Sequence, residues 1–282
     1  MKTNSHAFRI VKMAKVLEVS ASGYYAWLKR APSKRAIENK QLGIEIERIF
    51  YKSRRSYGSR KIQKTLLREE NKNVGLKRVI SIMRKHDLKS KVRRKYKATT
   101  NSAHHLPVSD NILNRRFEAT EPKQKLVSDI TYIPTDEGWL YLAAVMDLCG
   151  RRIVGASMDE RMTKDLVCNA LTDAVNRTGR SDGGILHSDR GSQYCSEAYR
   201  SLASSFGFIS SMSRTGNCWD NAPMESFWGK LKQEWLNEQH FKTRAEAKSA
   251  VFEYIWIFYN RQRLNAAIGY STPDEYYARA CA

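Results

Sequence analysis

The sequence predicts an α/β domain built on a mixed five-stranded sheet with helices, preceded by an all-α region. Apolar side chains recur at helical spacing up to residue 97, whereas short strand-like runs alternate with helical ones from Lys125 onward. The charge divides at nearly the same place. Residues 1–118 carry 30 Lys and Arg against 9 Asp and Glu, a balance of +21, and residues 119–282 carry 19 against 20, a balance of −1. This asymmetry indicates a first part that binds a polyanion and a second part with another task.

Composition narrows the class of protein. The chain has 282 residues, of which 41% are hydrophobic and 28% charged. It contains no run of eighteen apolar residues, so we expect no membrane span. The first ten residues lack the apolar core of a secretory signal, so we expect a cytoplasmic protein. Five scattered cysteines without CxxC spacing predict neither a zinc site nor a disulfide framework. Nucleic acid is the better candidate polyanion, because no amphipathic helix with a broad apolar face accompanies the charge.

Residues 1–35 are predicted to form a small helical segment. Apolar residues recur at helical spacing from Val11 to Leu17, and Ser20 can cap a second short helix. Helix, tight break and helix is the outline of a helix-turn-helix, but pairs of short helices also occur in proteins that do not bind DNA. Both interpretations stay open for this segment.

Residues 36–97 are predicted to form a basic, helix-turn-helix-like DNA-binding domain. We expect helices over about 36–51, from a cap at Ser59 onward, and over 76–83. The last of these helices carries four cations on its exposed side: Lys77, Arg78, Arg84 and Lys85. A solvated basic face on an ordinary helical bundle is the alternative interpretation.

A dense run of cations follows in the segment 89–97, whose sequence is KSKVRRKYK. Such a run repels itself, and contact with phosphates would relieve the repulsion through counterion release. We therefore expect four of its cations to contact DNA: Lys91, Arg93, Arg94 and Lys95. Residues 98–118 are polar and irregular and are predicted to be a linker.

A different pattern begins in the segment 119–282. Three strand-like runs separated by glycine-containing turns come first, over 126–133, 139–148 and 152–158. Helices and strands then alternate over 163–178, 184–188, 196–206 and 208–212. A long helix begins near Asn221 and continues past Trp235. Three antiparallel strands followed by alternating helices and strands is the element order of a ribonuclease H-like fold.

Three acidic residues stand where folding does not require an acid. Asp129 lies inside an otherwise apolar strand, Asp189 directly follows a buried strand, and Glu225 lies in the first turn of a helix that Asp220 or Asn221 could cap. Three carboxylates brought together repel one another unless divalent ions bind between them. Two ions roughly 3.5–4 Å apart suit phosphodiester chemistry. Hard oxygen ligands point to Mg²⁺, with Mn²⁺ as a substitute.

The spacing and surroundings of these acids match a known pattern. Asp189 and Glu225 are separated by 35 residues, which resembles the DD(35)E signature of retroviral integrases and related insertion-sequence transposases. The surrounding motifs are SDITYIPT (128–135), EGWLYLAAVMDL (137–148), HSDRGSQY (187–194) and DNAPMESFWGKLKQE (220–234). Further matches are SGYYAWLKR (22–30), SYGSRKI (56–62) and YNRQRLNAAIGYSTPDEY (259–276). Over nearly its whole length the chain resembles the OrfB-type transposase of the large two-frame insertion-sequence family, which has a retroviral-integrase-like DDE core.

This resemblance implies a DNA transposase that performs metal-dependent cleavage and strand transfer at the ends of an insertion sequence. It maps Asp129, Asp189 and Glu225 onto the family's catalytic and metal-binding triad. It maps Lys232 onto the family's basic residue seven places after the glutamate, which we expect to contact DNA. It also implies double-stranded DNA as substrate, a homo-multimer, and the upstream-frame OrfA-type product as partner or fusion. The expected place of action is the bacterial cytoplasm, at the nucleoid when DNA is bound.

Two other functions stay open at this point. A sequence-specific DNA-binding regulator without catalysis would need only the basic N-terminal part. A ribonuclease H-like nuclease would need the acids but would not join strands. Taken singly, each acid also has an ordinary structural explanation as a strand-edge residue, a turn former or a charge favoured by a helix dipole.

Four further polar residues are set aside as site candidates. Asp147 is expected to shape the turn before Gly150, and Asp220 and Glu234 fall outside the spacing of the signature. For His187, lining the site and packing within the core both stay open.

Overall fold

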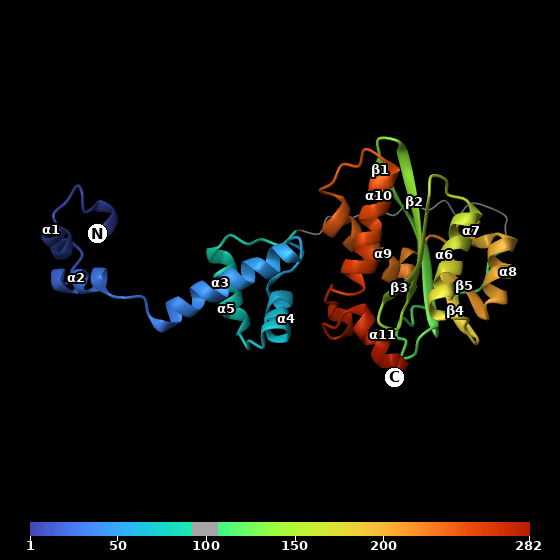
Figure 1. The fold of residues 1–282 in the computed structure, drawn as a ribbon, viewed down its shortest axis with the longest axis horizontal. Coiled ribbons are helices and arrows are strands. Elements are labelled where there is room, and N and C mark those ends of the chain that lie inside the picture. The colour runs from blue at the N-terminus through green and yellow to red at the C-terminus, as the bar shows by residue number, and fades with distance from the viewer. Residues whose placement is uncertain (92–106) are drawn as a thin grey trace.

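The computed structural model describes residues 1–91 and 107–282 of the chain. Arg93, Arg94 and Lys95 of the basic run, which were predicted to contact DNA, lie outside these described residues. Three parts follow one another: a helical pair, a group of three helices, and a domain built on a sheet (Figure 1). Among the helices of the described residues, none is both long and apolar enough to cross a lipid bilayer.

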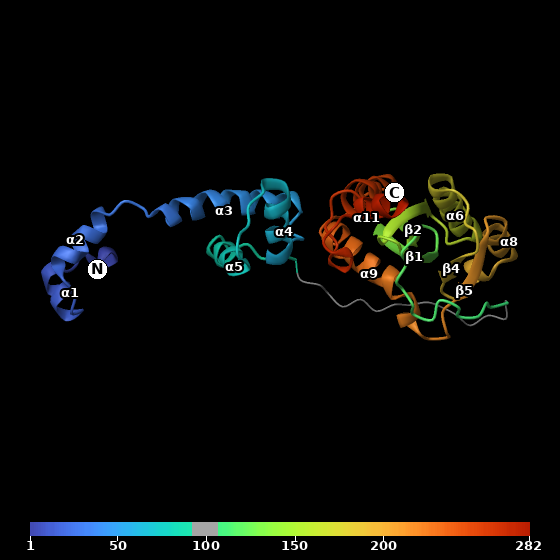
Figure 2. The same ribbon diagram turned by 90° about the horizontal axis from the view of Figure 1, so that it is seen from below.

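The N-terminal pair consists of α1 (Ile10–Val16) and α2 (Ala21–Lys29), after a short 3₁₀ turn, η1 (Lys2–Asn4). Ser20 caps α2 as predicted, because its hydroxyl accepts a hydrogen bond from the Gly23 backbone N–H at 3.1 Å. Ala14 is buried, whereas Val11 and Trp27 are more than half exposed. The pair stands apart from the other helices in both views (Figures 1 and 2), so it contributes little to the hydrophobic core.

The second part contains α3 (Lys34–Lys52), α4 (Ser59–Glu70) and α5 (Leu76–Lys85). Their apolar faces meet in a small core that includes Leu42, Ile46, Ile49, Phe50, Ile62, Leu66, Val79, Ile82 and Met83. Asn71 ends α4 in the left-handed conformation, with a φ of 52°. The prediction of a cap at Ser59 was wrong, because α4 begins at Ser59 with Gly58 as its N-cap and no side-chain cap bond.

The sheet contains five strands in the order β3-β2-β1-β4-β5. They are β1 (Lys125–Thr135), β2 (Gly138–Asp147), β3 (Arg152–Asp159), β4 (Gly184–Ser188) and β5 (Phe208–Met212). The first three pair antiparallel, as their glycine turns predicted, and β4 pairs parallel to both β1 and β5. This mixed sheet is the predicted ribonuclease H-like fold.

Helices cover both faces of the sheet (Figure 2). One face packs against α6 (Lys164–Thr178), α7 (Ser192–Cys195) and α8 (Glu197–Ser205). The other packs against α9 (Ala222–Leu231), the π-helical η3 (Lys232–Leu236), α10 (Arg244–Phe252) and the π-helical η4 (Glu253–Tyr259). Two short 3₁₀ turns, η2 (Cys218–Asn221) and η5 (Ala266–Ile268), and the terminal α11 (Pro273–Cys281) complete the domain.

Gly155 of β3 permits the close packing of α6. A Cβ atom at this position would lie 2.3 Å from the carbonyl oxygen of Ala170 and 2.7 Å from the Cβ of Ala174. Such a collision would push α6 off the sheet, and the buried apolar face of this helix would lose its contacts.

The α3–α5 helices dock against the C-terminal helices of the sheet domain. The Tyr57 hydroxyl accepts a hydrogen bond from the Leu264 backbone N–H at 2.8 Å and donates to the Gln262 carbonyl at 3.2 Å. One continuous apolar cluster runs from α3–α5 through α9, η3 and η4 to β1 and β2. The helical part and the sheet domain therefore share a core on this side.

Candidate active site

Parallel pairing brings Asp129 and Asp189 to the same level of the sheet. The last paired residues of β1 and β4 are Val127 and His187. Two residues further along β1 lies Asp129, on the same face of the strand as Val127. Two residues after His187 lies Asp189, which directly follows the last residue of β4. The carboxyl end of β4 is therefore where these two sequence-predicted acids meet.

The carboxylate of Asp129 accepts two hydrogen bonds from neutral donors. Its Oδ1 atom accepts from the Ile130 backbone N–H at 2.8 Å, and its Oδ2 atom accepts from the Trp228 indole Nε1–H at 2.9 Å. The side chain is half-buried. These bonds hold the plane of the carboxylate in one orientation.

Asp189 lies in the turn that was predicted to follow β4. Its Oδ1 atom accepts a hydrogen bond from the Gly191 backbone N–H at 2.9 Å. A Cβ atom at residue 191 would lie 3.1 Å from this oxygen and 3.0 Å from Oε1 of Gln193. Glycine therefore lets the turn close tightly around the carboxylate.

Glu225 lies in the first turn of α9, with Pro223 near the start of the helix, and α9 packs against β1. The expected side-chain cap by Asp220 or Asn221 was wrong. Asn221 occupies the N-cap position, but its side-chain amide donates instead to the Ser128 carbonyl at 3.1 Å. The Asp220 carboxylate is occupied by Arg214 and Arg115, at 2.7 and 2.8 Å. Partners outside the helix have thus taken both side chains away from the cap.

The three acids lie within electrostatic range of one another. Burial, the charge of Asp189 and, to a smaller extent, the charge of Glu225 together raise the pKa of Asp129 to about 8. The bonds from Ile130 and Trp228 act in the opposite direction but do not cancel these effects. A site of this kind resists full ionisation until a cation compensates it.

The donor chemistry of this acidic cluster fits a divalent ion. Carboxylate oxygens are the ligands that Mg²⁺ prefers in proteins, and mutual repulsion is what a bound cation would relieve. Within residues 1–91 and 107–282, however, no three His, Cys, Asp or Glu side chains lie close enough to form a ready-made metal site. The structure shows an acidic cluster at this position and no closed coordination shell among the described residues.

Lys232 lies next to the cluster, at the start of η3. Its Nζ atom is 4.9 Å from the centre of the Tyr132 ring on β1. Burial lowers the pKa of Lys232, and the charge of Asp129 acts in the opposite direction. The predicted basic residue therefore lies within electrostatic range of Asp129.

Trp228 was not named from the sequence, and Asn221 was named only as a candidate helix cap. Both contact β1 directly, through Asp129 and through the residue before it. Helical spacing was the signal that could have found them, because Asn221 lies four residues before Glu225 and Trp228 three residues after it.

The residues set aside have structural roles. Asp147 accepts the Lys123 and Cys149 backbone N–H groups at 2.7 and 2.9 Å and shapes the turn as expected. His187 is packed between the hydroxyls of Ser211 and Ser213, and burial lowers its pKa to about 4. It is therefore a neutral core residue.

The predicted DNA-contacting cations of the helical part fall into two groups. Lys77, Arg84 and Lys85 are exposed on α5, as expected. Arg78 pairs with Glu38 at 3.0 Å and donates to Asn39 at 2.7 Å, which reduces its availability.

Lys91 does not fit the prediction of a DNA contact. Its side chain is 10% exposed, its Nζ atom donates to the Glu234 carbonyl at 3.1 Å, and it pairs with Glu238 at 3.0 Å. Docking of the helical part against η3 has buried this cation within the protein, which the sequence alone did not reveal.

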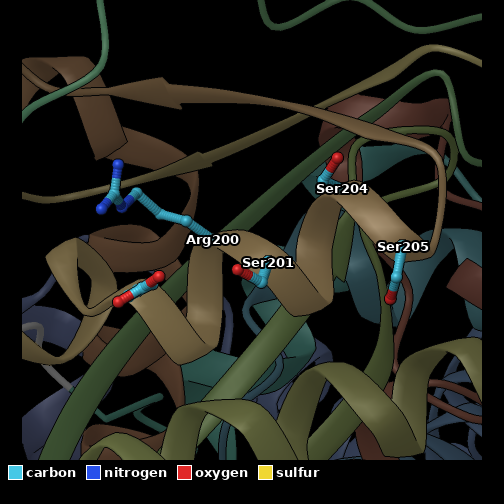
Figure 3. A pocket seen from close by; sticks show the side chains of 5 residues that line it. Arg200, Ser201, Ser204 and Ser205 are labelled. Atoms are coloured by element: carbon cyan, nitrogen blue, oxygen red, sulfur yellow. The ribbon is translucent and has the colours of Figure 1, made fainter.

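An open depression on the surface lies over α8 (Figure 3). It is lined by Glu197, Arg200, Ser201, Ser204 and Ser205. None of the residues that the sequence singled out as site candidates is among these lining residues. The depression therefore has no part in the predicted site.

Most of the chain matches models of known protein families. Residues 119–218 match an integrase core domain, residues 225–280 match a second integrase core domain model, and residues 36–96 match an HTH-like domain. The two integrase-core matches include all three acids and Lys232, and the HTH-like match includes the predicted basic helix. A helix-turn-helix-like part is thus joined to an integrase core.

Two solved structures with partial likeness to this chain are retroviral proteins. One is a chain of the simian T-cell lymphotropic virus intasome in complex with PP2A regulatory subunit B56 gamma, with TM-score 0.48, 14% identity, and coverage of 76% of this chain and 70% of that chain. Another is the HTLV-2 integrase catalytic core domain in complex with magnesium, with TM-score 0.45, 15% identity, and coverage of 56% and 97%.

Curated relatives match over almost the whole chain. An uncharacterized 31 kDa protein of insertion element IS600 from Shigella sonnei is 47% identical, over 93% of this chain and 96% of the relative. The transposase InsF for insertion sequence IS3A from Escherichia coli K12 is 39% identical, over 95% and 94%. These matches do not favour the regulator and nuclease alternatives. The chain therefore belongs to the DDE-type transposase family of IS3-like insertion sequences, whose members include the InsF proteins.

Proposed function

We propose that this transposase cleaves DNA at the ends of an insertion sequence and transfers the strands to a target, with Asp129, Asp189 and Glu225 as catalytic, metal-binding residues. The observation that carries the proposal is that both Asp189, which directly follows β4, and Glu225, in the first turn of α9, act electrostatically on Asp129 of β1. Burial and the charges of Asp189 and Glu225 raise the pKa of Asp129, and this cost of ionisation supports a cation as the partner of the three acids.

The residues of the site divide the work between them. Asp129, Asp189 and Glu225 would hold Mg²⁺, in a two-ion arrangement and with Mn²⁺ as a substitute. When bound, the ions supply Lewis-acid stabilisation and an activated hydroxyl nucleophile. Lys232 would hold a DNA phosphate beside the acids, because its ammonium group lies next to Asp129 along the α9–β1 contact.

Double-stranded DNA is the substrate that the charge distribution favours. Residues 1–118 carry the whole excess of +21, and exposed cations on α5 would contact phosphates: Lys77, Arg84 and Lys85. We assign DNA binding to 36–97 and catalysis to 119–282, with 1–35 as a further helical segment and 98–118 as the linker. Arg93, Arg94 and Lys95 belong to this proposal by sequence alone.

Assembly and location follow from the family. We propose that the chain acts as a homo-multimer on paired element ends, together with the upstream-frame OrfA-type product as partner or fusion. Its place of action would be the bacterial cytoplasm, at the nucleoid. Relatives named as transposases for IS3 support this view.

Strand transfer of a labelled element end in the presence of Mg²⁺ tests the proposal. Glu225→Gln is expected to reduce joining at least about 10³-fold, because the metal ligand is lost while the shape of the side chain is kept. Glu197→Gln is a matched control, since Glu197 lies in the first turn of α8 as Glu225 does in α9. Joining that survives in Glu225→Gln would contradict the assignment of the triad.

A further inference from the structure

We propose that Trp228 and Asn221 are positioning residues, which fix Glu225 relative to Asp129 by tying α9 to β1 on both sides of the glutamate. The proposal rests on the function proposed above and adds two residues to its site. It concerns how the acids are held in place before any ion or DNA arrives.

Two hydrogen bonds join the helix to the strand. The Trp228 indole Nε1–H donates to Oδ2 of Asp129 at 2.9 Å. The Asn221 amide Nδ2–H donates to the backbone carbonyl of Ser128 at 3.1 Å. Their acceptors belong to neighbouring residues of β1, so the two bonds hold one short stretch of the strand.

The spacing of the two donors places Glu225 between them. Glu225 and Trp228 are three residues apart on one face of α9, and Asn221 lies four residues before Glu225, at the N-cap of the helix. Lys232 continues the same face and contacts Tyr132 of β1. A rotation or slide of α9 would therefore break both hydrogen bonds as it moved Glu225 away from Asp129.

Packing makes the Trp228 contact rigid. Trp228 is 7% exposed, and its ring lies 4.9 Å from that of Phe227, which in turn lies 4.8 Å from that of Tyr259. Asn221 and Ser128 are also buried. Hydrogen bonds in such surroundings orient their acceptors well, because the partners have few alternative rotamers.

The consequence for Asp129 is orientation of its carboxylate. The indole holds Oδ2 and the Ile130 backbone holds Oδ1, and each oxygen keeps a further lone pair for a cation. Residues that orient metal ligands in this way commonly change metal affinity about 10- to 100-fold when they are removed.

The test measures Mn²⁺ binding to the full chain by calorimetry, without DNA, in Trp228→Phe. This change keeps most of the ring packing and removes the N–H donor. Trp235→Phe is the matched control, because Trp235 is 5% exposed and its Nε1 atom has no hydrogen-bond partner among the described residues. We expect Mn²⁺ affinity to fall about 10- to 100-fold in Trp228→Phe and to stay at the wild-type value in Trp235→Phe. Asn221→Ala should weaken Mn²⁺ binding in the same direction.

Three outcomes separate the possible failures. Unchanged or tighter Mn²⁺ binding in Trp228→Phe overturns the positioning role. An equal loss in Trp235→Phe also overturns it, since the effect would then be one of packing. Unchanged Mn²⁺ binding in Asp129→Asn would instead contradict the proposed ion site itself, independently of the result for Trp228→Phe.

A spectroscopic measurement on the chain that keeps Trp228 tests the proposal even if Trp228→Phe is destabilised. The chain has six tryptophans, whose indole N–H resonances are observable after ¹⁵N-indole labelling. One of them should move both when Mg²⁺ is added and when Asp129 is changed to Asn. If all six stay in place in both experiments, the indole does not sense the carboxylate and the proposal fails.

Discussion

Two carboxylates of the sheet domain, Asp129 and Glu234, lie in opposite electrostatic surroundings. Burial and the neighbouring acids raise the pKa of Asp129 to about 8. Burial also acts to raise the pKa of Glu234, but the neighbouring Arg263 holds this pKa below its usual value. The Nε and Nη2 atoms of Arg263 donate to the two oxygens of Glu234 at 2.6 and 2.5 Å.

The difference separates structural acids from those available for chemistry. Glu234 lies where α3–α5 dock and receives an arginine and the Tyr254 hydroxyl, at 3.1 Å. Asp220 is likewise compensated, by Arg214 and Arg115. The hydrogen bonds that Asp129 receives come from neutral donors instead, so a bound cation would stabilise the ionised form of this carboxyl group.

The largest expected effect on stability is that of Glu234→Gln. The change leaves the buried Arg263 uncompensated, and breaking such a pair costs about 3–5 kcal/mol of unfolding free energy. Chemical denaturation of the full chain measures the loss. Glu238→Gln is the control, because the pair between Glu238 and Lys91 is half-exposed on the glutamate side and should contribute about 0–1 kcal/mol. A loss below about 1 kcal/mol in Glu234→Gln would show that the pair is not the main support of the junction.

Asp129→Asn is expected to act in the opposite direction. Without divalent ions the neutral amide relieves the desolvation and repulsion that act on the ionised Asp129, so the free energy of unfolding should rise at pH 8. The same denaturation experiment measures it, with Glu197→Gln as a neutral reference. Destabilisation by Asp129→Asn in metal-free buffer would mean that the site is not under electrostatic strain.

The pH dependence of this gain sharpens the comparison further. The pKa of folded Asp129, about 8, lies above the ordinary value of 3.8, so folding favours the protonated acid. The contribution of the protonated Asp129 to the free energy of unfolding is fully present below pH 3.8 and is lost as the pH rises towards 8. The stability difference between Asp129→Asn and wild type should therefore be near zero at pH 4 and grow up to pH 8. A difference that is constant with pH would exclude titration of Asp129 as the cause.

The smallest effect is expected for single cations of the helical part. Lys85→Ala should weaken DNA binding of the full chain about equally for all sequences and lower the slope of log K against log salt by about 1. Lys91→Ala should leave that slope unchanged, because Lys91 is held within the protein. Titrations at several salt concentrations measure both. Equal slopes in Lys85→Ala and wild type would remove α5 from the DNA interface.

Local spacing made most of the elements predictable. The strand-like run 126–133 became β1, and the helical run 163–178 became α6 with Gly179 at its end. Caps were harder to predict, because they depend on competing partners. Ser20 caps α2 as expected, but Asn221 prefers the carbonyl of Ser128, which lies 93 positions away.

By itself the sequence determined the order of the elements, the division of charge and the identities of the three acids, since these depend on local pattern and motif spacing. Only the tertiary structure decided which cations stay exposed and which groups hold the acids. Trp228 and Asp129 are 99 positions apart, and they meet because α9 packs across β1. Lys91 is buried for the same kind of reason, because docking of the helices against η3 removes it from solvent.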